Sequence, residues 1–457
     1  MRSVHFVRPC TVAVILLPIA CAGDPAAAPL AIRHVTVVDG TEPRPRADQS
    51  VIIRGNRIVT VGPAAAVRTP WRARVIDGRD RYLIPGLWDM HVHTAMPGGD
   101  EVLPLYIANG VTGVRDMAGD WAQLTTWRAE IAAGTRIGPR MILSGPYLEG
   151  GDVPIPHLLV REPADAQIAV DSLMRLGVDF VKVHSQLSRE NYFAIARAAR
   201  ARDIPFAGHV PRSVRPEEAS DSGQRSIEHL LTIPNLCEES EVEALAPRFA
   251  VQGALGRCTT DDPAPLFARL VRNDTWVVPT LVAQLEVARW PMRDLPGDSV
   301  GHLLPQVLRD YVAGIFPMPD DVPAGADVNG LALFDKRVAV VGALHRAGVH
   351  VMAGTDAPLR NSPPGFGLHD ELGWFVRAGL APFDALRAAT IEPARFLGMQ
   401  DSLGMIAAGQ LADLVLLAAD PLSDVRNLRR IVVVIANGRP FEIERTAERV
   451  NLVPILR

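Results

Sequence analysis

Eight short apolar segments separated by helix-like stretches constrain the fold of this chain more than any other feature. Apolar runs bounded by polar, helix-like sequence are typical of buried strands, and strands that alternate with helices form parallel sheets. The predicted strands are residues 87–91, 111–116, 140–144, 180–184, 205–209, 226–229, 276–280 and 349–356. Eight such units predict an α/β protein with a (β/α)8 barrel, also called a TIM barrel.

Predicted helices lie between these strands, for example at residues 164–176, 189–202, 265–273 and 338–346. The barrel domain is therefore assigned to residues 87–404. One connecting region, residues 231–330, is longer than a single strand–helix unit requires. We expect it to contain an insertion over the mouth of the barrel.

Both ends of the chain carry further strand-like sequence. Short β-like runs punctuated by glycine turns fill residues 30–86. Strand character returns near the C-terminus at residues 411–417 and 431–438. We expect residues 30–86 and 405–450 to combine into one small composite β-sandwich domain beside the barrel.

The N-terminus has the pattern of an export signal. A short basic region precedes the apolar run at residues 11–20, which is too short to span a membrane. The pattern predicts a signal peptide over residues 1–22 and an Ala/Pro-rich tether over residues 23–29. Cleavage would release an exported, periplasmic protein. The alternative is that Cys21, within an imperfect lipobox, carries a lipid that anchors the protein to a membrane.

Export changes the interpretation of the four cysteines. Cys10 is lost with the signal peptide, and Cys21 is either lost or lipidated. Cys237 and Cys258 then remain in an oxidising compartment, where a disulfide between them is expected. The alternative is a pair of free buried thiols.

Charge and composition argue against a nucleic-acid partner. The formal net charge is −4, and the chain lacks a basic block or an alternation of basic and aromatic residues. The apolar fraction of 48% is ordinary for a globular protein. We expect the partner to be a small molecule, and the sequence carries no signal for the oligomeric state.

The tripeptide His91-Val92-His93 closes the first predicted barrel strand. Side chains alternate between the two faces of a strand, so both imidazoles point the same way. Imidazole is the commonest metal ligand in proteins, and such a pair is preorganised to bind an ion. Many His-x-His pairs are accidental, however, so the assignment of a metal site depends on other candidate ligands elsewhere in the chain.

A lysine in an apolar strand is the second unusual feature. The chain has only two lysines, and while Lys336 suits a solvated helix start, Lys182 lies within an apolar run. Burial disfavours the charged amine, and a neutral amine can act as a nucleophile, which a guanidinium cannot. Carbon dioxide would convert the neutral amine of Lys182 into a carbamate able to bridge two metal ions. The alternatives are a lysine that snorkels to solvent or one paired with a carboxylate.

Six ionisable residues fall at the C-terminal ends of predicted barrel strands, the edge at which barrel enzymes build their active sites. They are His91, His93, Lys182, His209, His229 and Asp356. Each has a structural alternative, such as a hydrogen-bonded core histidine or an aspartate that caps a helix. Their coincidence at one edge indicates a metal site.

These residues lie within an ordered set of motifs that resembles the amidohydrolase superfamily. The motifs are residues 85–93, 110–116, 180–183, 208–209, 227–229 and 353–356, with supporting stretches at 385–390 and 404–415. They are most similar to the imidazolonepropionase-related branch that includes metal-dependent Xaa-Pro dipeptidases with a carbamylated lysine. The resemblance covers nearly all of the mature chain, and residues 231–330 are its weakest region.

The resemblance implies a site with two divalent metal ions. The implied ligands are His91, His93 and Asp356 for a buried ion, His209 and His229 for an outer ion, and a carbamate on Lys182 together with a hydroxide between the two ions. Imidazole and oxygen ligands suit zinc. Asp356 would accept the proton of the hydroxide and pass it to the leaving amine.

Three further residues are candidates for substrate contact. Tyr147 follows the third strand, His184 shares a strand face with Lys182, and His369 follows the eighth strand. A structural role is an equal alternative for each of the three.

The combined prediction is an exported, metal-dependent hydrolase of amide or related C–N bonds. Dipeptides or N-acyl amino acids are the expected substrates, cleaved by a metal-bridging hydroxide. One alternative is a mononuclear deaminase of the same superfamily, against which Lys182 argues. The other is a barrel that has become a non-catalytic scaffold, against which the complete set of ligands argues.

Overall fold

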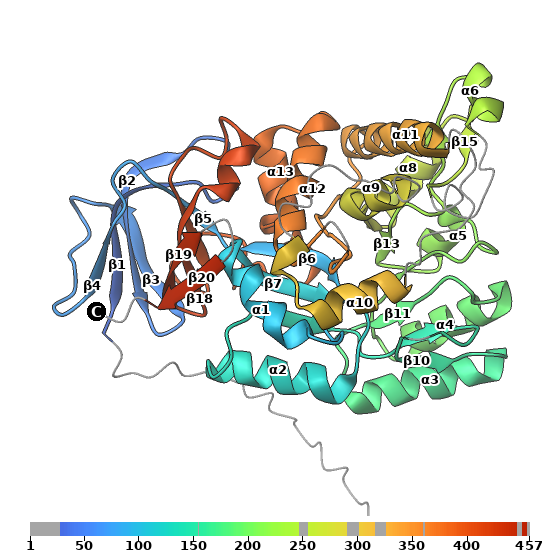
Figure 1. The fold of residues 1–457 in the computed structure, drawn as a ribbon, viewed down its shortest axis with the longest axis horizontal. Coiled ribbons are helices and arrows are strands. Elements are labelled where there is room, and N and C mark those ends of the chain that lie inside the picture. Colours follow the sequence, from blue (N-terminus) through green and yellow to red (C-terminus); the bar gives the residue numbers. More distant parts are fainter. Residues whose placement is uncertain are drawn as a thin grey trace, which may run out of the picture.

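The computed structural model describes residues 28–153, 155–245, 255–289, 301–315, 326–359, 362–445 and 450–454. They form a barrel of strands wrapped by helices, with a β-rich part beside it (Figure 1). The predicted signal peptide, Cys21 included, lies outside the described residues, as does the tether except for residues 28 and 29. Within the described part of the chain, no helix is long and apolar enough to cross a membrane.

Parallel strands of the barrel wall form one three-stranded and one six-stranded sheet. The first sheet contains β6 (Leu87–Val92), β7 (Val111–Asp116) and β8 (Arg140–Leu143). The second, in spatial order, contains β10 (His157–Leu159), β9 (Tyr147–Glu149), β11 (Val181–Val183), β12 (Phe206–Gly208), β13 (Ser226–Glu228) and β16 (Trp276–Val278). The first seven predicted strands therefore all overlap strands of the wall.

The eighth predicted strand, residues 349–356, lies where expected but forms isolated bridges instead of a continuous ladder. Val351 bridges Val277 of β16, and Ala357 bridges Val92 of β6. The segment thus closes the ring between the seventh and first strands. Its pairing is interrupted because the backbone turns into the left-handed region at Asp356, where φ is 61°.

Helices cover the outside of the barrel. They include α1 (Gly99–Ala108), α2 (Trp121–Ala133), α3 (Pro163–Leu176), α4 (Arg189–Ala201), α5 (Pro216–Asp221), α8 (Ala264–Arg272), α11 (Ala326–Arg346), α12 (Phe366–Arg377), α13 (Pro382–Ala388) and α14 (Ile391–Phe396). The bounds of α3 follow from local chemistry, because Pro163 is suited to a first helical position and Gly177, with φ of 84°, to the end.

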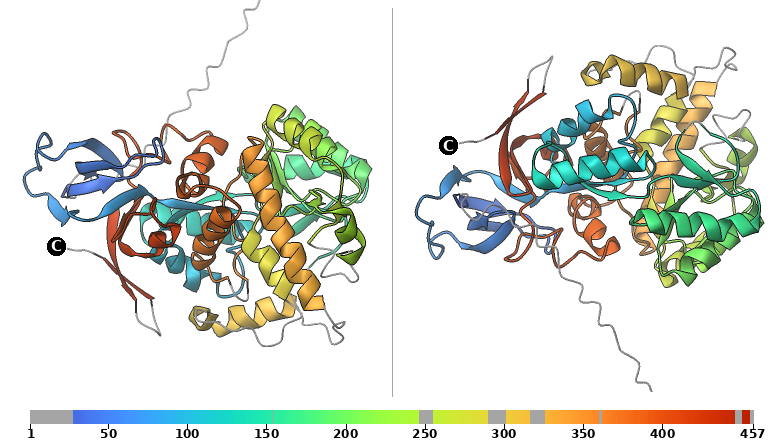
Figure 2. Two further views of the ribbon diagram at one scale, coloured as in Figure 1. Left: turned by 90° about the horizontal axis from the view of Figure 1, so that it is seen from above. Right: turned by 90° about the horizontal axis from the view of Figure 1, so that it is seen from below.

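Strands from both ends of the chain join in one nine-stranded sheet. Its members are β1 (Leu30–Val37), β2 (Arg46–Arg54), β3 (Arg57–Pro63), β4 (Arg74–Asp77), β5 (Tyr82–Pro85), β17 (Leu414–Leu417), β18 (Ile431–Ala436), β19 (Arg439–Arg445) and β20 (Val450–Pro454). β5 links the two sets, since it pairs in parallel with β1 and antiparallel with β17. The N- and C-terminal strands lie side by side in Figure 2, consistent with the predicted composite domain. The expected sandwich is, in its hydrogen bonding, a single continuous sheet.

The additional sequence of the 231–330 region lies on both sides of β16. Before β16 come β14 (Asn235–Leu236), α6 (Glu239–Ala244) and β15 (Cys258–Thr259), and after it come α9 (Leu281–Arg289), η1 (Gly301–Leu303) and α10 (Gln306–Ile315). A disulfide joins Cys237 to Cys258, with their Cα atoms 5.4 Å apart. α10 packs on α1 through Leu308, which contacts the same apolar cluster as Val102.

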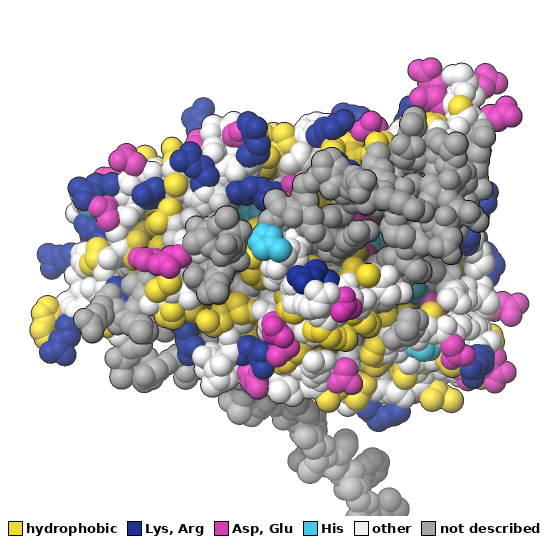
Figure 3. Space-filling view, in the orientation of Figure 1, with side chains coloured by type: hydrophobic (Ala, Val, Ile, Leu, Met, Phe, Trp, Pro, Cys, Tyr) yellow, Lys and Arg dark blue, Asp and Glu magenta, His cyan; other side chains and the backbone are white. Residues whose placement is uncertain are grey.

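The surface in Figure 3 intersperses basic and acidic side chains. On the face drawn there, outside the grey atoms, neither charge gathers into one large region.

Candidate metal centre

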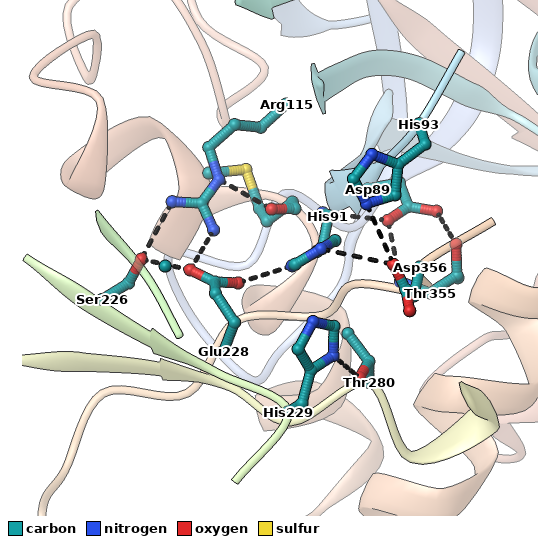
Figure 4. Close-up of polar contacts among 12 residues, drawn as sticks. Asp89, His91, His93, Arg115, Ser226, Glu228, His229, Thr280, Thr355 and Asp356 are labelled. Carbon is teal, nitrogen blue, oxygen red and sulfur yellow. Dashed lines mark hydrogen bonds and ion pairs between the residues drawn. The ribbon is translucent and has the colours of Figure 1, made fainter. Parts of the chain in front are cut away.

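Three side chains converge at one end of the barrel. Oδ1 of Asp356 lies 3.3 Å from Nε2 of His91 and 3.2 Å from Nε2 of His93, and candidate ligand atoms of the three residues all lie within 4.8 Å of one another (Figure 4). His91 is fully buried, and its Nε2 has no hydrogen-bond partner among the described residues. A buried nitrogen without a partner is costly, and a bound cation would satisfy it. The donor set therefore fits a divalent metal ion.

The other ring nitrogen of His91 is held by a buried charge network. Nδ1 of His91 lies 2.8 Å from Oε2 of Glu228, whose second oxygen accepts hydrogen bonds from Arg115 at 2.8 Å and from Ser226 at 2.5 Å. Burial opposes ionisation of Glu228, but the Arg115 guanidinium and His91 lower the pKa of this carboxyl well below its usual range. Nδ1 of His91 therefore carries the proton, and Nε2 keeps its lone pair for a ligand role.

His209 and His229 stand beside the three converging side chains. The ring of His229 lies 4.3 Å from that of His91 and 4.7 Å from that of His209, measured between ring centroids. Nδ1 of His229 bonds Oγ1 of Thr280 at 2.7 Å, and Nδ1 of His209 bonds Oγ of Ser185 at 2.6 Å. Each histidine thus keeps Nε2 for another partner. Burial and nearby positive groups lower the pKa of both histidines well below the usual range, which favours the neutral, ligating form.

Lys182 is buried in the same space. Its side chain is 1% exposed, and burial lowers its pKa to about 8, against the opposing charges of Glu228 and Asp356. This shift favours the neutral amine more than in an exposed lysine. Gly208 makes room for it, because a Cβ at that position would lie 2.9 Å from Cδ of Lys182. Of the six predicted ligands, the structure thus brings His91, His93 and Asp356 within ligand distance of one another, and His229 and His209 lie beside them through ring contacts. Lys182 is close enough for the charges of Glu228 and Asp356 to act on it.

Three residues of the site have left-handed backbone, a region that side chains other than glycine seldom adopt. They are His229 with φ of 60°, Thr280 with φ of 48° and Asp356 with φ of 61°. Such strain persists only where the surrounding structure stabilises it, and it is concentrated at functional sites.

Two buried carboxyl groups bond to the backbone beside the strained residues. Asp89 accepts hydrogen bonds from the backbone N–H of Thr355 at 3.0 Å and from its hydroxyl at 2.6 Å, immediately before Asp356. Glu371 accepts from the backbone N–H groups of Leu281 and Val282, each at 2.9 Å, immediately after Thr280. Burial raises the pKa of Asp89 to about 7 and that of Glu371 to about 8.

Sequence reasoning missed the roles of Asp89 and Glu228. For Glu371 it offered the capping of a helix, and Glu371 does accept from the first two N–H groups of α9. A signal for Asp89 and Glu228 was present, since each is an acidic residue inside a predicted barrel strand. A buried charge in a strand requires a partner. Their partners come from distant strands, however, and one sequence does not reveal which.

The three candidates for substrate contact occupy different places. Tyr147 is buried in β9, with its ring 4.6 Å from that of His184, and the ring of His184 lies 4.2 Å from that of His209. Tyr147 and His184 thus form a chain of ring contacts that leads to His209, one of the predicted ligands. His369 instead lies buried in α12, where its Nε2 donates to the backbone oxygen of Asn109 at 2.9 Å. This contact favours a structural role for His369 over the expected substrate contact.

Comparison with known proteins places the chain among related sequences and folds. The profile of the Amidohydrolase family matches residues 82–441. None of the curated proteins matches the sequence.

Solved structures share the fold across most of the chain. One is a Xaa-Pro dipeptidase with bound methionine in the active site, 20% identical, with a TM-score of 0.67, covering 91% of this chain and 100% of that one. A prolidase complexed with N-methylphosphonate-L-proline is 22% identical, with a TM-score of 0.67 and the same coverage. The A. niger ochratoxinase is 19% identical, with a TM-score of 0.64, covering 91% of this chain and 96% of that one. At these identities the likeness establishes the barrel fold.

Proposed function

The chain belongs to the amidohydrolase family, and we propose that it is an exported hydrolase that cleaves amide bonds of dipeptides or N-acyl amino acids with two divalent metal ions. The family and the cluster of His91, His93 and Asp356 make it a metal-dependent hydrolase of C–N bonds. The second ion, the carbamate, the substrate class and export are the proposed parts.

One observation carries the proposal of a binuclear site. His209 and His229 lie next to the first three ligands, each with Nδ1 occupied by a hydroxyl, and the amine of Lys182 is buried in the same space. The neutral amine of Lys182 would attack carbon dioxide, form a C–N bond and release a proton, leaving an anionic carbamate. Two imidazole pairs with carboxylate and carbamate oxygens form a donor set suited to zinc.

Asp356 is placed to move protons during hydrolysis. When bound, the ions would lower the pKa of a water molecule and polarise the scissile carbonyl. Oδ1 of Asp356 faces the two histidines, which leaves Oδ2 to take the proton of the attacking water and deliver it to the leaving amine. Although burial opposes ionisation, nearby histidines hold the pKa of Asp356 well below its usual range, so the group is ionised, the form in which it can accept a proton.

Two observations support small amide substrates. The related structures of a Xaa-Pro dipeptidase and a prolidase contain an amino acid and a proline-containing phosphonate, respectively. In this chain Tyr147 and His184 lie beside the metal ligands and are the proposed substrate contacts.

Export is proposed from the N-terminal pattern and agrees with the disulfide between Cys237 and Cys258, a bond characteristic of oxidising compartments. The intact mass of the protein secreted by a bacterial host tests it. Loss of residues 1–22 is expected, whereas an added lipid mass on Cys21 would identify a lipoprotein.

The first test of function is metal stoichiometry on the purified mature chain, combined with a panel of dipeptides and N-acyl amino acids. Two zinc ions per chain with turnover is the expected result. One ion would indicate a mononuclear, deaminase-like site, and none after metal supplementation would indicate a non-catalytic scaffold. Lys182→Arg keeps the positive charge but cannot form the carbamate, so it is expected to lose binuclear binding and activity.

A further inference from the structure

The loop between β3 and β4 presents an exposed tryptophan. Trp71 is 81% exposed, and it is the only exposed one among the tryptophans that the structure describes. Val75 in β4 is a second large apolar side chain on this surface, 55% exposed. An indole ring combines a large apolar face with an N–H donor, which suits it to the boundary between water and an apolar phase. The loop therefore displays an apolar group that the fold itself does not bury.

The same loop is held in a defined conformation. Arg33 of β1 donates hydrogen bonds to three oxygen atoms of the loop, at 2.6 to 3.1 Å. The N–H of Ala73 donates to the backbone oxygen of Pro70 at 3.0 Å, which closes a turn with Trp71 and Arg72 at its centre. Arg72 has a φ of 62°, although a positive φ at the third residue of a turn favours glycine or asparagine. An arginine at such an unfavourable position points to a use for its side chain.

Arginines surround the exposed indole. The guanidinium carbon of Arg72 lies 4.1 Å from the centroid of the Trp71 ring. Arg68 and Arg72 are exposed, and neither forms an ion pair with a carboxylate of the described residues. We call this surface the basic–aromatic patch, and it consists of Arg68, Trp71, Arg72, Arg74 and Val75.

The patch belongs to a basic part of the chain. Residues 28–86 contain ten arginines against five aspartates and glutamates, a formal charge of +5, whereas the whole chain has a net charge of −4. Charges of both signs are interspersed on the face drawn in Figure 3, but the positive excess comes from these N-terminal strands. Their surface is therefore complementary to an anionic partner.

The N-terminal segment joins the fold beside the patch. The N–H of Arg74 donates to the backbone oxygen of Pro29 at 2.8 Å, and Arg74 pairs with Leu30 in the parallel ladder of β4 and β1. In Figure 1, β4 lies at the end of the molecule remote from the barrel. Cys21 precedes the first described residue by seven positions, which span at most about 25 Å of extended chain. Membrane attachment at Cys21 would therefore keep the patch close to the bilayer.

We propose that the basic–aromatic patch binds the surface of a bilayer that contains anionic lipids. The arginines would contact lipid phosphate groups, and the indole of Trp71 would enter the boundary between the headgroups and the acyl chains. A bilayer is favoured over a soluble anion because the exposed indole gains free energy only where an apolar phase is present. The patch does not depend on the metal centre or on the proposed hydrolysis. If Cys21 is lipidated, the patch supplies the second signal that stable anchoring requires.

The test is co-sedimentation of the mature chain without a lipid, residues 23–457, with vesicles of phosphatidylcholine alone or mixed with phosphatidylglycerol. We expect binding to the mixed vesicles at low ionic strength and a loss of binding as salt is added, because salt screens exposed charges. The tryptophan emission should shift to shorter wavelength as the indole leaves water. Trp71→Ala should remove this shift and weaken binding, and Arg68→Gln and Arg72→Gln should each weaken binding about fivefold.

Two exposed residues of other elements provide matched controls. Ile168→Ala removes an apolar side chain that is 66% exposed on α3, and Arg272→Gln removes an exposed arginine of α8. Both variants should bind the mixed vesicles as the wild type does, and because every substitution is at an exposed side chain, all variants should keep the wild-type melting temperature.

Three outcomes would overturn the proposal. The first is that the wild-type chain fails to bind the mixed vesicles at low ionic strength. The second is wild-type binding by Trp71→Ala, which would leave the indole without a role. The third is that Arg272→Gln weakens binding as much as Arg72→Gln does, because attraction by the whole surface would then account for the binding.

Discussion

Replacing Glu228 by glutamine tests how the buried charge network holds the metal centre. The substitution preserves size but removes the negative charge that pairs with Arg115 at 2.8 Å and accepts from Nδ1 of His91 at 2.8 Å. Both Glu228 and Arg115 are buried, with side chains at most 1% exposed. The guanidinium would then be left without its counter-ion inside the barrel.

Two effects of different origin are expected. Breaking a buried ion pair costs about 3–5 kcal/mol, because the remaining charge is desolvated and unpaired. Loss of the carboxylate behind a ligating histidine weakens metal binding by about 10- to 100-fold, since the imidazole becomes less basic. The first effect belongs to the metal-free protein and the second to zinc affinity, so they are separable.

The assays are urea unfolding of the metal-free proteins and zinc competition against a chelator. Glu218→Gln is the control, because it removes a carboxylate from a pair with Arg189 near the surface, whose side chains are 20% and 49% exposed, worth about 0–1 kcal/mol. The lowered pKa of Glu228 also predicts a pH dependence. Its stabilisation is present above pH 4.5, its ordinary pKa, and is lost as the pH falls below that value. The reasoning is refuted if Glu228→Gln matches Glu218→Gln in metal-free stability and binds zinc with wild-type affinity.

Three further predictions concern the other partners of the site. Thr280→Val removes the hydroxyl that bonds Nδ1 of His229. In a cobalt titration, binding of the outer ion should weaken about 10- to 100-fold while the inner ion is retained. Unchanged binding of both ions would contradict the role of Thr280. Lys182→Met should stabilise the metal-free chain at pH 7 by roughly 3 kcal/mol. Folding lowers the pKa of Lys182 from 10.5 to about 8, so the unfolded chain binds the proton of this amine more tightly than the folded chain. The charged lysine therefore favours unfolding, and methionine removes that penalty. That advantage should shrink as the pH rises from 8 to 10.5, and a pH-independent difference in unfolding free energy would count against it. Replacing Cys237 and Cys258 by serine should cost about 3 kcal/mol of stability from loop entropy, and an unchanged melting temperature under non-reducing conditions would exclude a stabilising bond.

The fold was accessible from the sequence because its signals are local. Alternation of apolar and helix-like segments depends on neighbouring residues, and it located seven strands of the barrel wall. The same holds for α3, whose proline and glycine mark its two ends. The eighth strand was harder to define, because its pairing depends on a left-handed turn at Asp356 that local sequence does not reveal.

The predicted metal ligands could be grouped from the sequence for a related reason. In a parallel barrel every strand ends at the same rim, so residues at strand ends are brought together whatever their separation in sequence. His369, for which a structural role and substrate contact were equal alternatives, shows what this reasoning does not decide. It follows the eighth strand in sequence, but α12 turns its ring towards the backbone of Asn109.

The sequence by itself therefore determined the fold class and the rim at which the predicted ligands gather, since strand period and strand order control these, and the family motifs supplied the predicted chemistry. Only the tertiary structure decided which groups support the ligands. Glu228 meets His91 across 137 residues, Glu371 anchors the turn after Thr280 across about 90 residues, and Glu149 meets His184 across 35 residues. Such pairs follow from how strands and helices are arranged in space, because a buried charge binds whichever partner the fold brings to it, and nothing in the local sequence names that partner.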